Sequence, residues 1–69
     1  MSVVKVIEVV AQSDKGFDEA VRTAVQEVGK TVKGIKSVWV ENFSAKVENG
    51  KITNYRVNAR ISFLVEGKK

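Results

Sequence analysis

The sequence predicts an α+β domain in which one amphipathic helix covers one face of a three-stranded, antiparallel or mixed sheet, in the order β-α-β-β. Three features support this fold: an N-terminal stretch rich in β-branched residues, an apolar stripe at helical spacing, and two alternating stretches around an Asn-Gly pair. We expect all 69 residues to form one domain, with residues 66–69 as a loose tail.

The first strand is predicted over residues 3–11, "VVKVIEVVA", because this run is short and β-branched. The segment "QSDKG" then breaks the run. Ser13 or Asp14 is expected to cap the following helix, because a side-chain oxygen at that position accepts a hydrogen bond from the first helical turn. The acidic residues Asp18 and Glu19 would lie near the positive end of the helix dipole.

The helix is predicted from apolar residues that recur at steps of three and four over about five turns. These residues are Phe17, Ala20, Val21, Ala24, Val25, Val28 and Val32. Gly34 is expected just after the helix, and Gly29 is either a flaw inside it or an early end. One side of this helix therefore faces the core.

A hairpin is predicted at Asn49-Gly50, because a two-residue type I′ turn needs positive φ at both central positions. The paired strands would cover residues 36–48 and 51–65. A right-handed crossover makes the first two strands parallel and leaves the third antiparallel between them.

The turn also predicts which residues face each other, starting from Glu48 opposite Lys51, unless a bulge intervenes. Two pairs are expected under the helix: Val38 with Ile61, and Val40 with Ala59. Three pairs are expected on the opposite face: Trp39 with Arg60, Glu41 with Asn58, and Phe43 with Arg56. Aromatic and arginine side chains on an uncovered face are typical of a contact surface.

Charge and composition exclude several functions. The net charge is +4, but apart from a Lys30, Lys33, Lys36 cluster at the expected helix end and a basic tail, the basic residues are scattered. No nucleic-acid motif accompanies them, so no nucleic-acid partner is expected. No stretch approaches the length of a membrane span and the N-terminus lacks a signal-peptide pattern, so we expect no membrane partner and a cytoplasmic location.

The chain contains no His and no Cys, which removes the usual base, thiolate and transition-metal ligands. No catalytic residues, no metal site and no enzyme activity are therefore expected. A domain this small usually needs a disulfide, a structural metal or a partner subunit. Self-association is the remaining option.

Three stretches cover nearly the whole chain and resemble the dodecin family: "VIEVVAQSDKGFDEAV", "GKTVKGIKSVWVENF" and "ENGKITNYRVNARISFLVEG". The resemblance implies a hollow homo-dodecamer of β-α-β-β subunits that binds flavins. In this family a tryptophan on the second strand stacks on the isoalloxazine ring, and a glutamine on the third strand hydrogen-bonds it.

Both signature positions differ here: Ser37 stands at the tryptophan position, with Trp39 two residues later, and Arg56 stands at the glutamine position. Arginine offers donors only and suits a phosphate or carboxylate. The candidate cofactor-binding residues are therefore Ser37, Trp39, Arg56 and Arg60. Trp39 is either a ligand contact or a packing residue between subunits.

Two functions follow from this resemblance. The first is a non-catalytic storage protein that sequesters flavin (riboflavin, FMN or FAD), or a similar flat anionic cofactor, at an altered site. The second is a structural or ion-storing shell that does not bind flavin.

Overall fold

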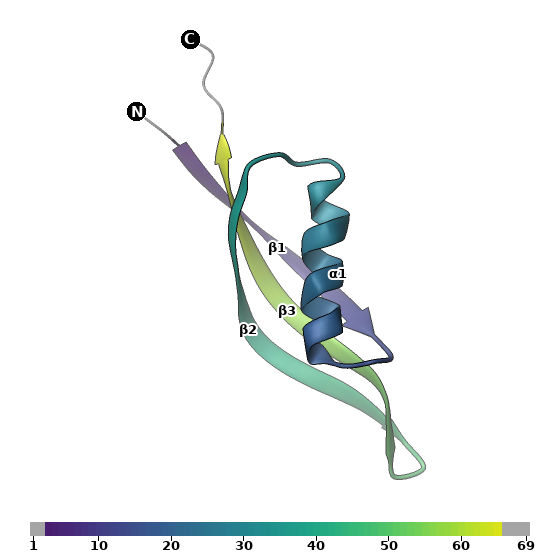
Figure 1. The fold of residues 1–69 in the computed structure, drawn as a ribbon. Helices are drawn as coiled ribbons and strands as arrows, with labels where there is room; N and C mark the ends of the chain where they lie inside the picture. The colour runs from purple at the N-terminus through teal and green to yellow at the C-terminus, as the bar shows by residue number, and fades with distance from the viewer. Residues whose placement is uncertain (1–2, 66–69) are drawn as a thin grey trace.

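The computed structural model describes residues 3–65, and the predicted tail at 66–69 lies outside them. The elements are β1 (Val3–Ser13), α1 (Phe17–Gly29), β2 (Ile35–Glu48) and β3 (Lys51–Val65) (Figure 1). The strand order is β1-β3-β2, and β3 is antiparallel to both neighbours. The predicted β-α-β-β fold, with the third strand between the other two, is confirmed.

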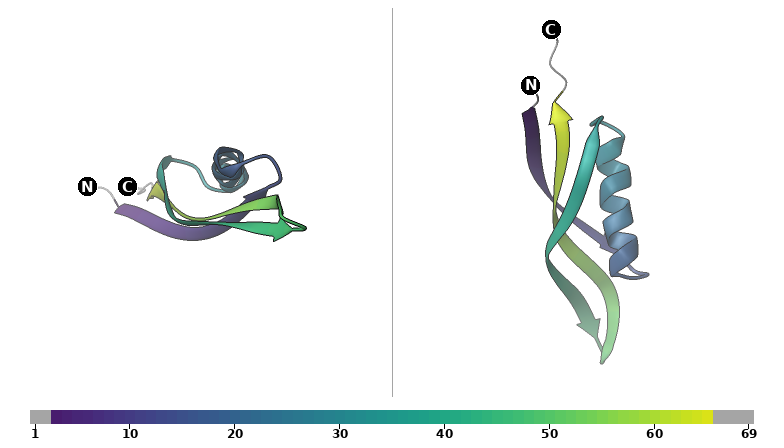
Figure 2. Two further views of the ribbon diagram at one scale, coloured as in Figure 1. Left: turned by 90° about the horizontal axis from the view of Figure 1, so that it is seen from below. Right: turned by 60° about the vertical axis from the view of Figure 1, so that its left-hand side comes forward.

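The helix covers one face of the sheet and leaves the other without a covering layer, as the end-on view in Figure 2 shows. The core between helix and sheet is built from small and β-branched side chains. Its buried apolar members are Ala11, Ala20, Ala24, Val57, Ala59 and Ile61. Alanines on the inner side of α1 let the helix approach β3 closely, and alternate residues of β3 point toward them, as the sequence predicted.

The start of α1 differs from the prediction. Gly16 is the N-cap residue in an extended conformation, and no side chain caps the helix. Ser13 belongs to the end of β1, where its hydroxyl accepts a hydrogen bond from the Lys15 amide at 3.0 Å. The predicted Ser13 or Asp14 cap is therefore wrong, because β1 is longer than expected and its last residue, Ser13, bonds within the turn instead.

The helix ends at Gly29, so the early-end alternative is correct and the five-turn estimate is too long. No basic residue lies in its last turn; Lys30 is the C-cap, and Lys33 and Lys36 lie beyond it. Gly34 has φ +80° and its carbonyl accepts a hydrogen bond from the Leu64 amide at 3.0 Å. A Cβ at Gly34 would lie 3.2 Å from the Leu64 carbonyl, so glycine allows β2 to begin close against β3.

The hairpin turn is confirmed by positive φ at Asn49 (54°) and Gly50 (76°), with Glu48 opposite Lys51. Near the helix C-terminus the predicted pairs are also correct. These are Val38 with Ile61, Trp39 with Arg60, and Val40 with Ala59.

Between these two regions the register differs from the prediction. Shifts occur between Val40 and Asn42 on β2 and again between Lys46 and Val47 near the turn. The first leaves Glu41 as an extra residue on β2, and the second leaves an extra residue on β3, so the two offsets cancel.

The intervening residues consequently pair one position away from the prediction. Phe43 lies opposite Val57, and Arg56 lies opposite Ser44. The expected pairs Phe43 with Arg56 and Glu41 with Asn58 are therefore wrong. Directly opposed residues share a face, so Phe43 lies on the helix side with the buried Val57.

Candidate ligand site on the uncovered sheet face

The face of the sheet away from α1, called the uncovered face below, carries side chains from all three strands. By register they include Val4, Val6, Glu8, Val10 and Gln12 of β1, Ser37, Trp39, Asn42 and Ser44 of β2, and Arg56, Asn58, Arg60 and Ser62 of β3. All four predicted site residues lie on this face. They do so because they alternate with the residues that pack under the helix.

Four large apolar side chains of this face are exposed in the single chain: Val4 (56%), Val6 (43%), Val10 (60%) and Trp39 (45%). A sheet face with this much apolar area and no helix above it is typical of an interaction surface.

Arg60 lies at the centre of this face between two carboxylates. Its Nε is 2.9 Å from Glu41 Oε2, and its Nη2 is 3.2 Å from Glu8 Oε2. Glu41 is the extra residue of the β2 bulge, so the bulge supplies one of the two carboxylates. The Arg60 guanidinium is thereby oriented and its charge is compensated. Glu8 was not identified from the sequence, because only the β1–β3 register places it opposite Arg60.

Trp39 lies opposite Arg60 across the β2–β3 pair. Among residues 3–65 the aromatic ring contacts involve Phe17, Phe43 and Tyr55 and do not include Trp39. The indole therefore keeps an exposed surface beside a fixed arginine.

Ser37 stands next to Trp39 on the same face of β2 and lies opposite Ser62. The two hydroxyl oxygens are 2.6 Å apart, and Ser62 is only 7% exposed. The position expected to carry the stacking tryptophan instead carries a small hydroxyl that satisfies a buried one.

Arg56 forms a second cluster on the same face of β3. Its Nη2 donates to Gln12 Oε1 at 3.2 Å, and Asn54 Nδ2 donates to the same oxygen at 3.1 Å. A shallow hollow lies here, lined by Ser44, Ala45, Lys46, Asn54 and Arg56. The predicted site is thus divided: Ser37, Trp39 and Arg60 lie together, whereas Arg56 belongs to this second cluster.

A second hollow of about 230 Å³ lies at Asn58, which stands between the two arginines along β3. It is lined by Glu8, Val9, Val10, Glu41, Asn58 and Ala59. Within residues 3–65 no group of three or more His, Cys, Asp and Glu side chains is placed to hold a metal ion. In the same part of the chain, no helix is long and apolar enough to cross a membrane.

The chain matches the family model for dodecin over residues 3–66. The chain belongs to the dodecin family. No curated protein sequence matches it significantly.

Solved dodecin structures share the fold closely. An arginine-to-alanine mutant of the T. thermophilus dodecin superposes with a TM-score of 0.93 at 22% identity, covering 97% of this chain and 100% of that one. The dodecin of Streptomyces coelicolor gives 0.91 at 28% identity, covering 97% and 96%. The calcium dodecin of Mycobacterium tuberculosis, described as calcium chelating with a novel calcium-binding site, gives 0.81 at 30% identity, covering 99% and 97%.

Proposed function

We propose that this member of the dodecin family is a non-catalytic storage protein that holds a flavin on the uncovered face, at contacts between subunits of a homo-dodecamer. Riboflavin, FMN and FAD, or a similar flat anionic cofactor, are the ligands considered. The site would be completed by a second copy of the chain, because the uncovered face of one subunit is shallow. We expect the protein to act in the cytoplasm.

The exposed indole of Trp39 carries this proposal. It is 45% exposed on a face that also presents exposed valines, and an isoalloxazine ring needs a flat apolar surface of this kind. Arg60 beside it is oriented by the carboxylates of Glu8 and Glu41, so a guanidinium lies next to the indole. These features support stacking of a flat ring near Trp39.

The residues at the two altered positions, Ser37 and Arg56, are expected to lower the affinity for flavin. Ser37 offers no ring plane, and its hydroxyl is already within hydrogen-bond distance of Ser62. Arg56 donates where a glutamine would both donate and accept, so it matches only part of a flavin edge. We therefore propose a flavin site that is weaker than one with both signature residues.

Quenching of flavin fluorescence tests the proposal. Titration of FMN with the purified wild-type protein should give saturable quenching, and Trp39→Ala should weaken binding by about tenfold, because stacking and apolar burial are lost together. Phe43→Leu is the matched control, since Phe43 is an exposed aromatic residue on the helix side. Equal affinities for wild type and Trp39→Ala would rule out Trp39 as the stacking residue.

A structural or ion-storing shell is the second candidate, and one relative supports it. The calcium dodecin of Mycobacterium tuberculosis is 30% identical to this chain. Calcium titration calorimetry distinguishes the two candidates. Saturable calcium binding without flavin quenching would favour the shell, and flavin quenching without calcium binding would favour the first proposal.

A further inference from the structure

The two arginines of the uncovered face differ in how their charge is compensated. Arg60 contacts the carboxylates of Glu41 and Glu8 at 2.9 and 3.2 Å. Arg56 instead contacts the neutral amide of Gln12 at 3.2 Å, and within residues 3–65 it forms no ion pair. The positive charge of Arg56 is therefore uncompensated by its neighbours.

Gln12 orients Arg56 without neutralising it. Its Oε1 accepts one hydrogen bond from Arg56 Nη2 and one from Asn54 Nδ2, at 3.2 and 3.1 Å. A guanidinium has five N–H donors, so most of those on Arg56 remain available to a ligand. These contacts join β1 to β3 and orient the guanidinium of Arg56.

The hollow beside Arg56 has a volume of about 290 Å³ and contains further donors. Ser44 lies opposite Arg56 in register, and it lines the hollow together with Lys46, which carries an ammonium group. Lys46 also meets Glu48 at 3.5 Å, but both side chains are more than half exposed, so this pair competes little with a ligand. Among residues 3–65, none of those that line the hollow carries a carboxylate.

We propose that this hollow is a subsite for a phosphate monoester, bound by Arg56, Lys46 and Ser44 and oriented through Gln12. A phosphate group offers three acceptor oxygens, and the planar guanidinium fork matches two of them. If the subsite binds the phosphate group of a bound flavin, the inference rests on the proposed function. In that case the protein should bind a phosphorylated flavin more tightly than riboflavin.

The subsite itself is tested with inorganic phosphate, without any flavin. The full-length protein in its native assembly is titrated against phosphate at low ionic strength, and binding is followed by ³¹P NMR. We expect saturable binding that weakens as salt rises, because exposed charges are screened. Absence of saturable binding would overturn the proposal.

Gln12→Glu provides the decisive variant, because it keeps the side-chain shape and the acceptor while placing a carboxylate beside Arg56. It should weaken phosphate binding at least tenfold by compensating the charge as Glu8 does at Arg60. Gln26→Glu, on the exposed side of α1, makes the same charge change away from the hollow and should leave binding unchanged. Equal effects of the two variants would attribute binding to net charge and refute the subsite.

Flavin binding then links the subsite to the proposed function. FMN should bind about tenfold more tightly than riboflavin in the wild type, and this ratio should fall toward one in Gln12→Glu. Phosphate binding without any flavin binding would reject the proposed function and support the subsite. Equal affinity for FMN and riboflavin in the wild type, together with no saturable binding of inorganic phosphate, would refute the subsite and leave the flavin proposal standing.

Discussion

The ring of Phe43 packs edge-on against the ring of Phe17, with centroids 5.0 Å apart and an interplanar angle of 88°. Phe17 makes a similar contact with Tyr55, also at 5.0 Å. The three rings join the first residue of α1 to β2 and β3. This contact exists because the bulge at Glu41 turns Phe43 to the helix side of the sheet.

Removal of the Phe43 ring should therefore lower fold stability. Phe43→Ala is expected to cost about 0.5 to 1.5 kcal/mol through the lost aromatic contact, besides the lost apolar area. Thermal unfolding at fixed protein concentration measures the effect, with Phe43→Leu as the variant that keeps most of the area. If Phe43→Lys dissociates the assembly without lowering the unfolding temperature, Phe43 faces a subunit contact and this assignment fails.

The hydroxyls of Ser37 and Ser62 should be energetically coupled. Ser37→Ala leaves the buried Ser62 hydroxyl without its partner and should cost about 1 kcal/mol or more, whereas replacing both serines with alanine should cost less than the sum of the single changes. Chemical denaturation of the wild type, both single variants and the double variant completes the cycle. Strict additivity would show that the 2.6 Å contact contributes nothing to stability.

Assembly should depend on the uncovered face. Light scattering should give a mass near twelve times the 7.6 kDa chain. Val10→Lys should give smaller species, because Val10 is 60% exposed on this face and a lysine buried between subunits must lose its hydration. Gln26→Lys, on the outer side of α1, is the control and should assemble normally. A monomeric or dimeric wild type would contradict the proposed assembly.

Restoring the family's two signature residues should strengthen flavin binding. The Ser37→Trp, Arg56→Gln double variant is expected to bind riboflavin about tenfold more tightly than the wild type, since a stacking plane and a mixed donor-acceptor are regained. The Ser37→Trp change leaves the hydroxyl of Ser62 without its partner. Adding Ser62→Ala to the double variant removes that hydroxyl. Fluorescence quenching gives the affinities. Tighter binding by the wild type would mean that Trp39 already serves as the stacking residue.

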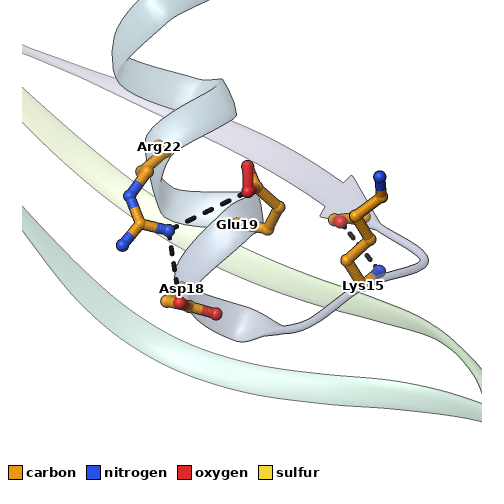
Figure 3. A network of polar contacts seen from close by, with 5 residues as sticks. Lys15, Asp18, Glu19 and Arg22 are labelled. Atoms are coloured by element: carbon orange, nitrogen blue, oxygen red, sulfur yellow. Dashed lines mark hydrogen bonds and ion pairs between the residues drawn. The ribbon is translucent and has the colours of Figure 1, made fainter.

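The pKa of Asp18, in the first turn of α1, should depend on its contact with Arg22. The hydrogen bond from Arg22, at 3.2 Å, lowers the pKa of Asp18 below its ordinary value of 3.8 (Figure 3). A lowered carboxyl pKa stabilises the fold above the unfolded-state pKa, and that stabilisation is lost as the pH falls through the folded-state value. Arg22→Ala should raise the pKa of Asp18, as measured by NMR titration, while Lys30→Ala should not. An unchanged value in Arg22→Ala would exclude this cause.

The order of elements followed from local features of the sequence. The β-branched run, the helical stripe and Asn49-Gly50 each act over a few residues, so they predict strand, helix and turn without knowledge of the fold. The turn also predicted that Val38, Trp39 and Val40 face residues 59–61. That prediction was correct because the register shift between Lys46 and Val47 and the opposite shift between Val40 and Asn42 cancel before Val40 is reached.

Tertiary structure decided the features that depend on neighbouring strands. The bulge at Glu41 places Phe43 against Phe17, and local sequence patterns do not reveal that contact. The β1–β3 register likewise places Glu8 beside Arg60 and Gln12 beside Arg56. The sequence alone therefore determined that two arginines share one face with Trp39. The bulge at Glu41 and the pairing with β1, from the distant end of the chain, together decided that one arginine is neutralised and the other remains available to an anion.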